Sequence, residues 1–126
     1  MPKSKLKIRW LKECEAHNYP AAHSYLSLIY PPNRAKRIVA KLKVAHLSEF
    51  KAKDIFRASG HSLLGISNSH VERDRKKIEE GDSLSPLLLV RGSTRGKTVI
   101  ADGYHRLCAI YSLHEDTVIR CKICDD

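Results

Sequence analysis

Long apolar runs are missing from this 126-residue sequence. No stretch approaches the ~18 apolar residues that a membrane-spanning helix needs. The basic N-terminus, MPKSKLKIRW, lacks the apolar core of a secretory signal. The sequence therefore predicts an ordinary globular chain in the cytoplasm that has no membrane partner.

Cysteine is scarce as well. The four residues Cys14, Cys108, Cys121 and Cys124 are too dispersed for a disulfide framework, which favours a reducing compartment. Cys121 and Cys124 form a single C-x-x-C pair, but a zinc site needs four ligands, and only Cys108 and His114 could join them. We therefore expect no zinc, no haem and no metal ion held by protein ligands alone.

Acidic residues are nearly absent from the first third of the chain. Residues 1–45 hold ten of the 23 Lys and Arg residues but only Glu13 and Glu15 of the 14 acids, for a net charge of +8. The remaining 81 residues carry about +1. This asymmetry predicts a surface for an anionic partner, such as nucleic acid or an acidic protein. The alternative is a solvated helical surface without a partner.

Periodic patterns indicate how this basic third is organised. Apolar positions at helical spacing predict an amphipathic helix over residues 4–16. A second helix is expected to begin at Asn18 and to end at Pro31, and Asn33 is expected to cap a third. Residues 1–45 are therefore interpreted as a basic helical N-terminal extension.

Residues 46–126 predict a second unit with mixed α+β structure. Alternation of charged and apolar residues over 48–53 is typical of a half-buried strand. Ser69 and Glu72 fit a capping box at a helix start. The run Leu87–Val90, bounded by turn residues, predicts a buried strand. The remaining expected elements are strands at 98–101 and 117–123 and helices at 54–58, 70–80 and 104–114.

The stretch TVIADGYHRLCAIYSL carries the strongest chemical signal. A predicted strand stops at Asp102, and Gly103 allows close approach to the main chain before a helix begins. A helix start offers unpaired N–H groups and the positive end of its dipole to an anion. Arg106 adds a planar fork suited to phosphate, and His105 adds a donor that titrates near neutrality. We expect both side chains to be free to point at the turn.

The order of elements resembles the ParB/sulfiredoxin superfamily over about residues 48–123. The shared features are a helix ending in Gly, a Pro-led strand, a second strand, a glycine turn with basic residues, a helix and a final strand. The resemblance implies a small mixed sheet with packed helices, here preceded by the basic extension. It also implies that the glycine turn binds nucleotide phosphates.

The turn itself resembles three members of that superfamily. Asp102 and Gly103 before a His-Arg pair resemble the free-standing ParB-like serine kinases, which implies transfer of a phosphoryl group from a nucleotide to a small substrate. Gly103, Tyr104, His105 and Arg106 are similar to the Gly-Cys-His-Arg of sulfiredoxin, and Gly103 and Arg106 match two positions of the Gly-Glu-Arg-Arg of ParB. Tyr104 stands where sulfiredoxin has its nucleophilic cysteine, and Cys108 is expected to pack inward. Both observations argue against sulfinic-acid reduction. The four residues of the turn are our candidate phosphate ligands.

Further site residues are candidates by position. Asp102 could hold water, metal or a substrate hydroxyl, His105 could donate to developing charge, and Glu49 is a candidate catalytic carboxylate. Phosphoryl chemistry of this kind usually needs Mg²⁺ bridging the phosphate oxygens. Seven residues are candidates for completing the anion pocket, each with solvated surface as its alternative: Lys51, Lys53, Arg57, Asn68, His70, Lys76 and Lys77.

Two functions are compatible with these features. The first is a ParB-like domain that binds a nucleotide or other phosphate ligand and hydrolyses the nucleotide or transfers a phosphoryl group to a small molecule. The second is a non-catalytic module that binds nucleic acid or an acidic partner through the basic N-terminal helices.

Overall fold

The computed structural model describes residues 7–63, 68–93 and 96–126. Within these ranges the chain forms five helices, a four-stranded mixed sheet and a two-stranded parallel pair, which confirms the α+β class. None of the helices in this part of the chain is long and apolar enough to cross a membrane. The elements are β1 Arg9–Trp10, α1 Asn18–Leu26, α2 Pro32–Val44, β2 Leu47–Lys51, α3 Ala52–Ser59, α4 Ser69–Glu79, β3 Ser83–Leu84, β4 Leu87–Gly92, β5 Lys97–Asp102, α5 Tyr104–Leu113 and β6 Val118–Asp125.

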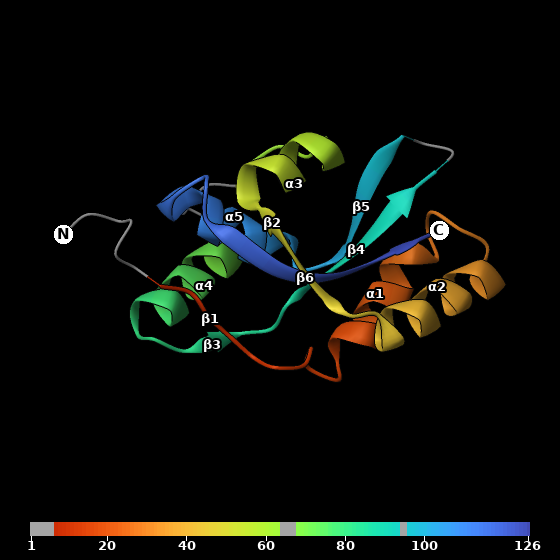
Figure 1. Cartoon of the computed structure of the whole chain (residues 1–126), viewed down its shortest axis with the longest axis horizontal. Helices are drawn as coiled ribbons and strands as arrows, with labels where there is room; N and C mark the ends of the chain where they lie inside the picture. The colour runs from red at the N-terminus through yellow and green to blue at the C-terminus, as the bar shows by residue number, and fades with distance from the viewer. Residues whose placement is uncertain (1–6, 64–67, 94–95) are drawn as a thin grey trace.

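The central sheet has the strand order β2-β6-β4-β5 (Figure 1). β4 and β5 form an antiparallel hairpin, β6 runs parallel to β4, and β2 pairs antiparallel with β6. β4 therefore has a neighbour on each side, and its first four residues are all buried, as the apolar run 87–90 predicts.

Helices cover both faces of the sheet. Leu87 and Leu89 point to the face that packs against α3 and α5, with α4 behind them. Leu88 and Val90 point to the opposite face, which α1 and α2 cover. The alternation follows from the two-residue period of a strand. The helices of the basic third thus supply one of the two apolar layers, and α1 runs beside β5 at the edge of the sheet (Figure 1).

The expected helix over 4–16 is wrong for the residues that the structure describes. Residues 7–17 contain no helix, and β1 instead pairs in parallel with β3. Leu11 N donates to Leu84 O at 2.9 Å, which extends this pairing. Ile8 and Trp10, two residues apart, both pack against the core under α4 and α5. A two-residue period fits these contacts, so pairing with β3 prevails over the helical spacing.

The two predicted helices that follow are present. α1 starts at Asn18 as expected, and α2 buries Ile38, Val39 and Leu42 against the sheet. The expected cap is wrong, because α2 already begins at Pro32, one residue before Asn33. Proline is well suited to the first helical turn, where its missing N–H costs nothing.

The cap of α4 is also shifted by one residue. The Asn68 side chain, not that of Ser69, accepts hydrogen bonds from His70 N at 3.0 Å and Val71 N at 3.3 Å. Asparagine is as good a cap as serine, so Asn68 satisfies the first free N–H groups of the helix. The predicted capping box of Ser69 and Glu72 is therefore wrong.

Candidate functional site

The turn between β5 and α5 is built around Gly103. Its φ of +107° lies in the left-handed region, and a Cβ there would lie 2.6 Å from Cγ of Leu87 in the core. Only glycine fits both conditions. No side chain of the described residues caps α5, so the first N–H groups at the positive end of its dipole have no capping partner there. The predicted strand–Asp–Gly–helix geometry is therefore present.

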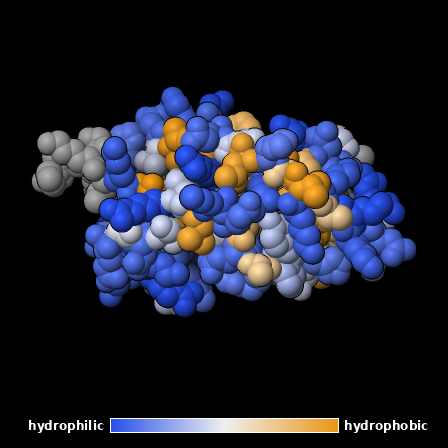
Figure 2. Space-filling view, turned by 60° about the horizontal axis from the view of Figure 1, so that its bottom comes forward, coloured by the Kyte–Doolittle hydropathy of each residue, from blue (hydrophilic) through white to orange (hydrophobic). Residues whose placement is uncertain are grey.

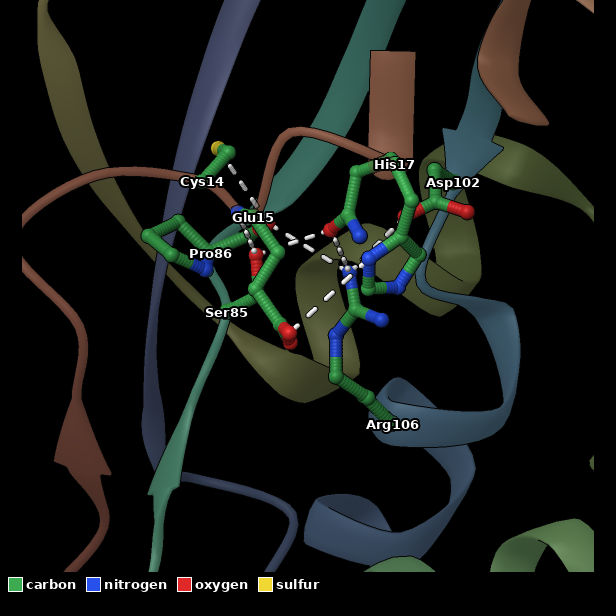
Figure 3. Close-up of polar contacts among 8 residues, drawn as sticks. Cys14, Glu15, His17, Ser85, Pro86, Asp102 and Arg106 are labelled. Atoms are coloured by element: carbon green, nitrogen blue, oxygen red, sulfur yellow. Dashed lines mark hydrogen bonds and ion pairs between the residues drawn. The ribbon is translucent and has the colours of Figure 1, made fainter. Parts of the chain in front are cut away.

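Arg106 is not free, contrary to expectation. Its Nη2 donates to Asp102 Oδ2 at 3.1 Å, to Asn18 Oδ1 at 3.2 Å and to Pro86 O at 3.4 Å (Figure 3). The side chain is 17% exposed, and its buried Nε has no hydrogen-bond partner among the described residues. Arg106 therefore joins three segments of the chain and offers only part of its fork to a ligand.

A wider polar network fixes the segment before α1 to the same place. The Asn18 amide oxygen also accepts from Ser85 Oγ at 2.8 Å, and Ser85 Oγ accepts from Glu15 N at 3.0 Å. The Cys14 thiol donates to Pro86 O at 3.6 Å. Figure 3 shows these groups converging between the start of α1 and the end of the Arg106 side chain. The network places Glu15 beside the start of α5, far away in sequence.

A cavity of about 210 Å³ opens beside this turn. One wall is the face of α4 that carries His70, Arg73, Asp74 and Lys77, which lie at helical spacing. The opposite wall is the segment before α1, with Glu15 and His17, whose side chains lie 3.9 Å apart. The charged and histidine side chains that line the cavity are Glu15, His17, His70, Arg73, Asp74, Lys77, Asp102, His105 and Arg106.

His105 lies at the junction of the two helices. Its ring centroid is 4.8 Å from that of His70, whose Nδ1 lies 2.8 Å from Arg73 Nη2. Burial lowers the pKa of His105 below its usual value, and His70 lowers it further, whereas the carboxylate of Asp74 opposes the shift. The surroundings of His105 therefore favour its neutral form more than water does.

A second cavity, of about 300 Å³, lies on the other side of the same turn. Tyr25, His61 and Tyr104 contribute aromatic rings to it, and both cavities share residues 102–105. The rings of His61 and Tyr104 lie 5.0 Å apart, and the Tyr104 hydroxyl donates to the carbonyl of Ser62. The turn therefore separates a charged cavity from an aromatic one.

Several candidates from the sequence lie elsewhere. Lys51 and Lys53 approach the carboxylate of Asp116 at 3.9 and 2.7 Å. Arg57 approaches Asp54 at 3.8 Å on α3. None of these three basic residues lines the cavity at the turn. Lys51 lies on β2, the edge strand opposite β5 in the sheet.

Of the remaining candidates, some line the cavity at the turn and others do not. Glu49 pairs with Arg120 at 3.5 Å on β6 and does not line the cavity. Asn68 serves as the cap of α4, whereas His70 faces the cavity directly. Asp102 lines it too, with its carboxylate bound to Arg106.

Of the α4 wall, sequence reasoning found His70 and Lys77 but missed Arg73 and Asp74, and it also missed the segment before α1. Arg73 and Asp74 lie at helical spacing from His70 and Lys77, so their place on the same face could have been recognised from the sequence. Nothing in the sequence indicates that Glu15 joins them, because that contact depends on β1 pairing with β3.

The C-x-x-C pair does not converge. Cys121 packs in the core under α3 and α5, whereas Cys124 packs against the layer of α1 and α2 on the opposite face. Burial raises the pKa of the Cys121 thiol to about 12, and burial also raises the pKa of Cys124. Cys108 is fully buried, as predicted. Among the described residues no group of three or more metal-ligating side chains is assembled.

Comparisons of the chain with known protein families, with curated proteins and with solved structures give no match. A functional assignment therefore depends on the chemistry of the residues at the turn and in the two cavities.

Proposed function

We propose that this protein binds the phosphate groups of a nucleotide in the cavity between the start of α5, α4 and the segment before α1. The observation that carries the proposal is that one cavity combines the start of α5, which no described side chain caps, with basic side chains from α4 and α5. Arg73 and Lys77 supply charge from α4, and His105 supplies a donor from α5. Backbone N–H groups, helix dipole and cationic side chains together favour a multiply charged anion.

The second cavity favours a nucleotide over inorganic phosphate. A ligand whose phosphates contact the N–H groups after Gly103 can place an aromatic base on the far side of the turn, among Tyr25, His61 and Tyr104. Aromatic rings stabilise a base by stacking. The ParB/sulfiredoxin-like arrangement of elements, which we propose as the finer fold, is consistent with this ligand.

The carboxylates of the cavity differ in what they can do. The carboxylate of Asp102 is already engaged by Arg106 at 3.1 Å. Glu15 has no Lys or Arg partner among the described residues and its side chain is 48% exposed. If Mg²⁺ accompanies the nucleotide, phosphate oxygens and one carboxylate suffice to hold it, and Glu15 fits that role. Glu15 is also the carboxylate best placed to accept a proton from water or a substrate hydroxyl.

A thermal-shift panel tests the proposal. ATP, ADP, CTP and GTP at millimolar concentration, with and without Mg²⁺, should raise the melting temperature, because a ligand that binds only the folded state stabilises it. Tripolyphosphate should give a smaller rise, and adenosine without phosphate a negligible one. If no phosphate compound moves the melting temperature, the proposal is overturned. A rise with adenosine equal to that with ATP would assign the binding to the aromatic cavity alone.

A further inference from the structure

A second cationic feature lies between α1 and α2, on the other layer of the fold. A groove of about 500 Å³ runs between these helices and shares no residue with the cavity at the turn. Its lining combines basic side chains with apolar and aromatic ones and contains no acid. The residues are Tyr19, Pro20, His23, Lys36, Val39, Ala40 and Lys43.

The lysines of this groove have no carboxylate partner among the described residues. Lys36 and Lys43 are seven residues apart on α2, so they lie on one face, about 10 Å apart along the helix. By contrast, the neighbouring Arg34 approaches Asp126 at 3.7 Å. The stretch 16–48 contains no Asp or Glu at all. The positive charge of the groove is therefore not neutralised from within its own helices.

An aromatic ring is fixed in the wall of the groove. Lys122 is buried and its Nζ donates to the Tyr19 hydroxyl at 3.1 Å and to the carbonyl of Lys43 at 3.0 Å. Nζ of Lys43 lies 5.7 Å from the centre of the Tyr19 ring. These contacts hold the ring beside the apolar surface of Val39 without closing the groove. A cationic rim next to a fixed aromatic ring is the combination that binds unpaired bases and their phosphates.

We propose that the groove between α1 and α2 binds single-stranded nucleic acid. Lys36 and Lys43 contact successive phosphates, and the wall with Tyr19 receives an unpaired base. A duplex keeps its bases stacked inside the helix and could use only the lysines. On the face shown in Figure 2 hydrophilic side chains predominate and apolar ones lie in small separate groups, which favours a charged partner over an apolar one.

The test is fluorescence anisotropy of the full chain with a short labelled oligothymidylate over a range of salt concentrations. The variant Lys36→Glu/Lys43→Glu should weaken binding roughly 25-fold or more at 0.1 M salt, because each phosphate contact contributes about 0.7 to the slope of log affinity against log salt. The matched control, Lys76→Glu/Lys97→Glu, makes the same change of charge on α4 and β5 and should weaken binding far less. Equal melting temperatures of the two variants show that both fold.

Four outcomes would overturn the proposal. They are no binding by the unchanged protein at low salt, equal losses in the two double variants, binding of duplex as tight as that of the single strand, and displacement of the oligonucleotide by millimolar ATP. Displacement by ATP would indicate that the oligonucleotide binds in the cavity at the turn. Nucleotide binding by Lys36→Glu/Lys43→Glu should be unchanged, so failure here is separate from failure of the proposed function.

Discussion

Nη2 of Arg106 lies 3.1 Å from Oδ2 of Asp102, and the pair links the last residue of β5 to the first turn of α5 around Gly103. Both side chains are largely buried, at 17% and 19% exposure. The same nitrogen also reaches Asn18 and Pro86, so one guanidinium joins the start of α1 and both ends of the β4–β5 hairpin. Arg106 thus stabilises the fold at the place where a phosphate would bind.

Replacing Arg106 should therefore destabilise the protein. Arg106→Ala removes the donor to the largely buried Asp102 carboxylate and leaves the Asn18 amide oxygen with the Ser85 hydroxyl alone, at a cost of about 2 kcal/mol. The exposed Arg91–Asp125 pair supplies a control, since Arg91→Ala should cost less than about 1 kcal/mol. Urea unfolding midpoints measure both variants. Equal midpoints would show that the contacts of Arg106 contribute nothing to stability.

Lys77 offers a cleaner test of charge at the cavity. It is exposed on α4 and has no carboxylate partner among the described residues. Lys77→Ala should weaken ATP binding roughly tenfold, the usual effect of losing one favourable contact with a charged group, without changing the melting temperature. Lys76→Ala, at the next position and outside the cavity lining, is the control for isothermal titration calorimetry. Unchanged affinity in Lys77→Ala would place the phosphates elsewhere.

Glu15 should matter for turnover and not for binding. If the bound nucleotide is hydrolysed, Glu15→Gln should reduce release of inorganic phosphate from ATP at least about 100-fold, the lower range for loss of a general base. Measured without Mg²⁺, the affinity for ATP should not fall, since the glutamine keeps the size of the side chain and removes a negative charge from the cavity. Glu49→Gln, on β2, is the matched control. Equal rates of phosphate release from the Glu15 variant and the unchanged protein would show that Glu15 takes no part in hydrolysis.

His105 should determine how the stability of the protein and its affinity for phosphate change with pH. Burial and His70 lower its pKa in the folded state, and Arg73 and Arg106 act in the same direction, against Asp74. Below the unfolded pKa of about 6.5 the unfolded chain takes up a proton that the folded chain resists, so stability falls as the pH falls. A bound phosphate reverses the preference, so binding takes up a proton and tightens over the same range.

His105→Gln separates this effect from the ionisation of the ligand itself. Between about pH 7.5 and 5.5, the ratio of ATP affinities of the unchanged protein and the variant should rise as the pH falls. Titration calorimetry in buffers of different ionisation enthalpy measures the proton uptake directly. A ratio that stays constant over this range would show that His105 does not contact the bound phosphates.

Gly103→Ala should damage the fold more than any surface change. The new Cβ would meet Leu87 at 2.6 Å and would require a left-handed backbone conformation. Strain and overpacking together should cost about 3 kcal/mol. Gly96→Ala is the control, since its φ of +66° also requires a left-handed backbone but no atom of the described residues lies within 4 Å of the added Cβ. Similar unfolding midpoints would mean that the contact with Leu87 relaxes without cost.

Much of the secondary structure could be predicted from the sequence. The run Leu87–Val90, the break at Asp102–Gly103 and the helix starting at Tyr104 are local signals, because a strand buried on both faces and a glycine turn each need particular residues. Helical spacing likewise determines that Ile38 and Leu42 face inward on α2. These features depend on periods of two and 3.6 residues, which the sequence carries by itself.

Only the tertiary structure decides which residues meet. Residues 8–10 could satisfy either period, and the parallel partner β3, about 70 positions away, selects the strand. That pairing brings Glu15 to the start of α5, so no local pattern could have predicted its place in the candidate site. The burial of Arg106 has the same origin, since its acceptors belong to α1, β5 and the segment before β4. Long-range hydrogen bonds depend on how the chain packs, and a sequence period reports only which face of an element turns inward.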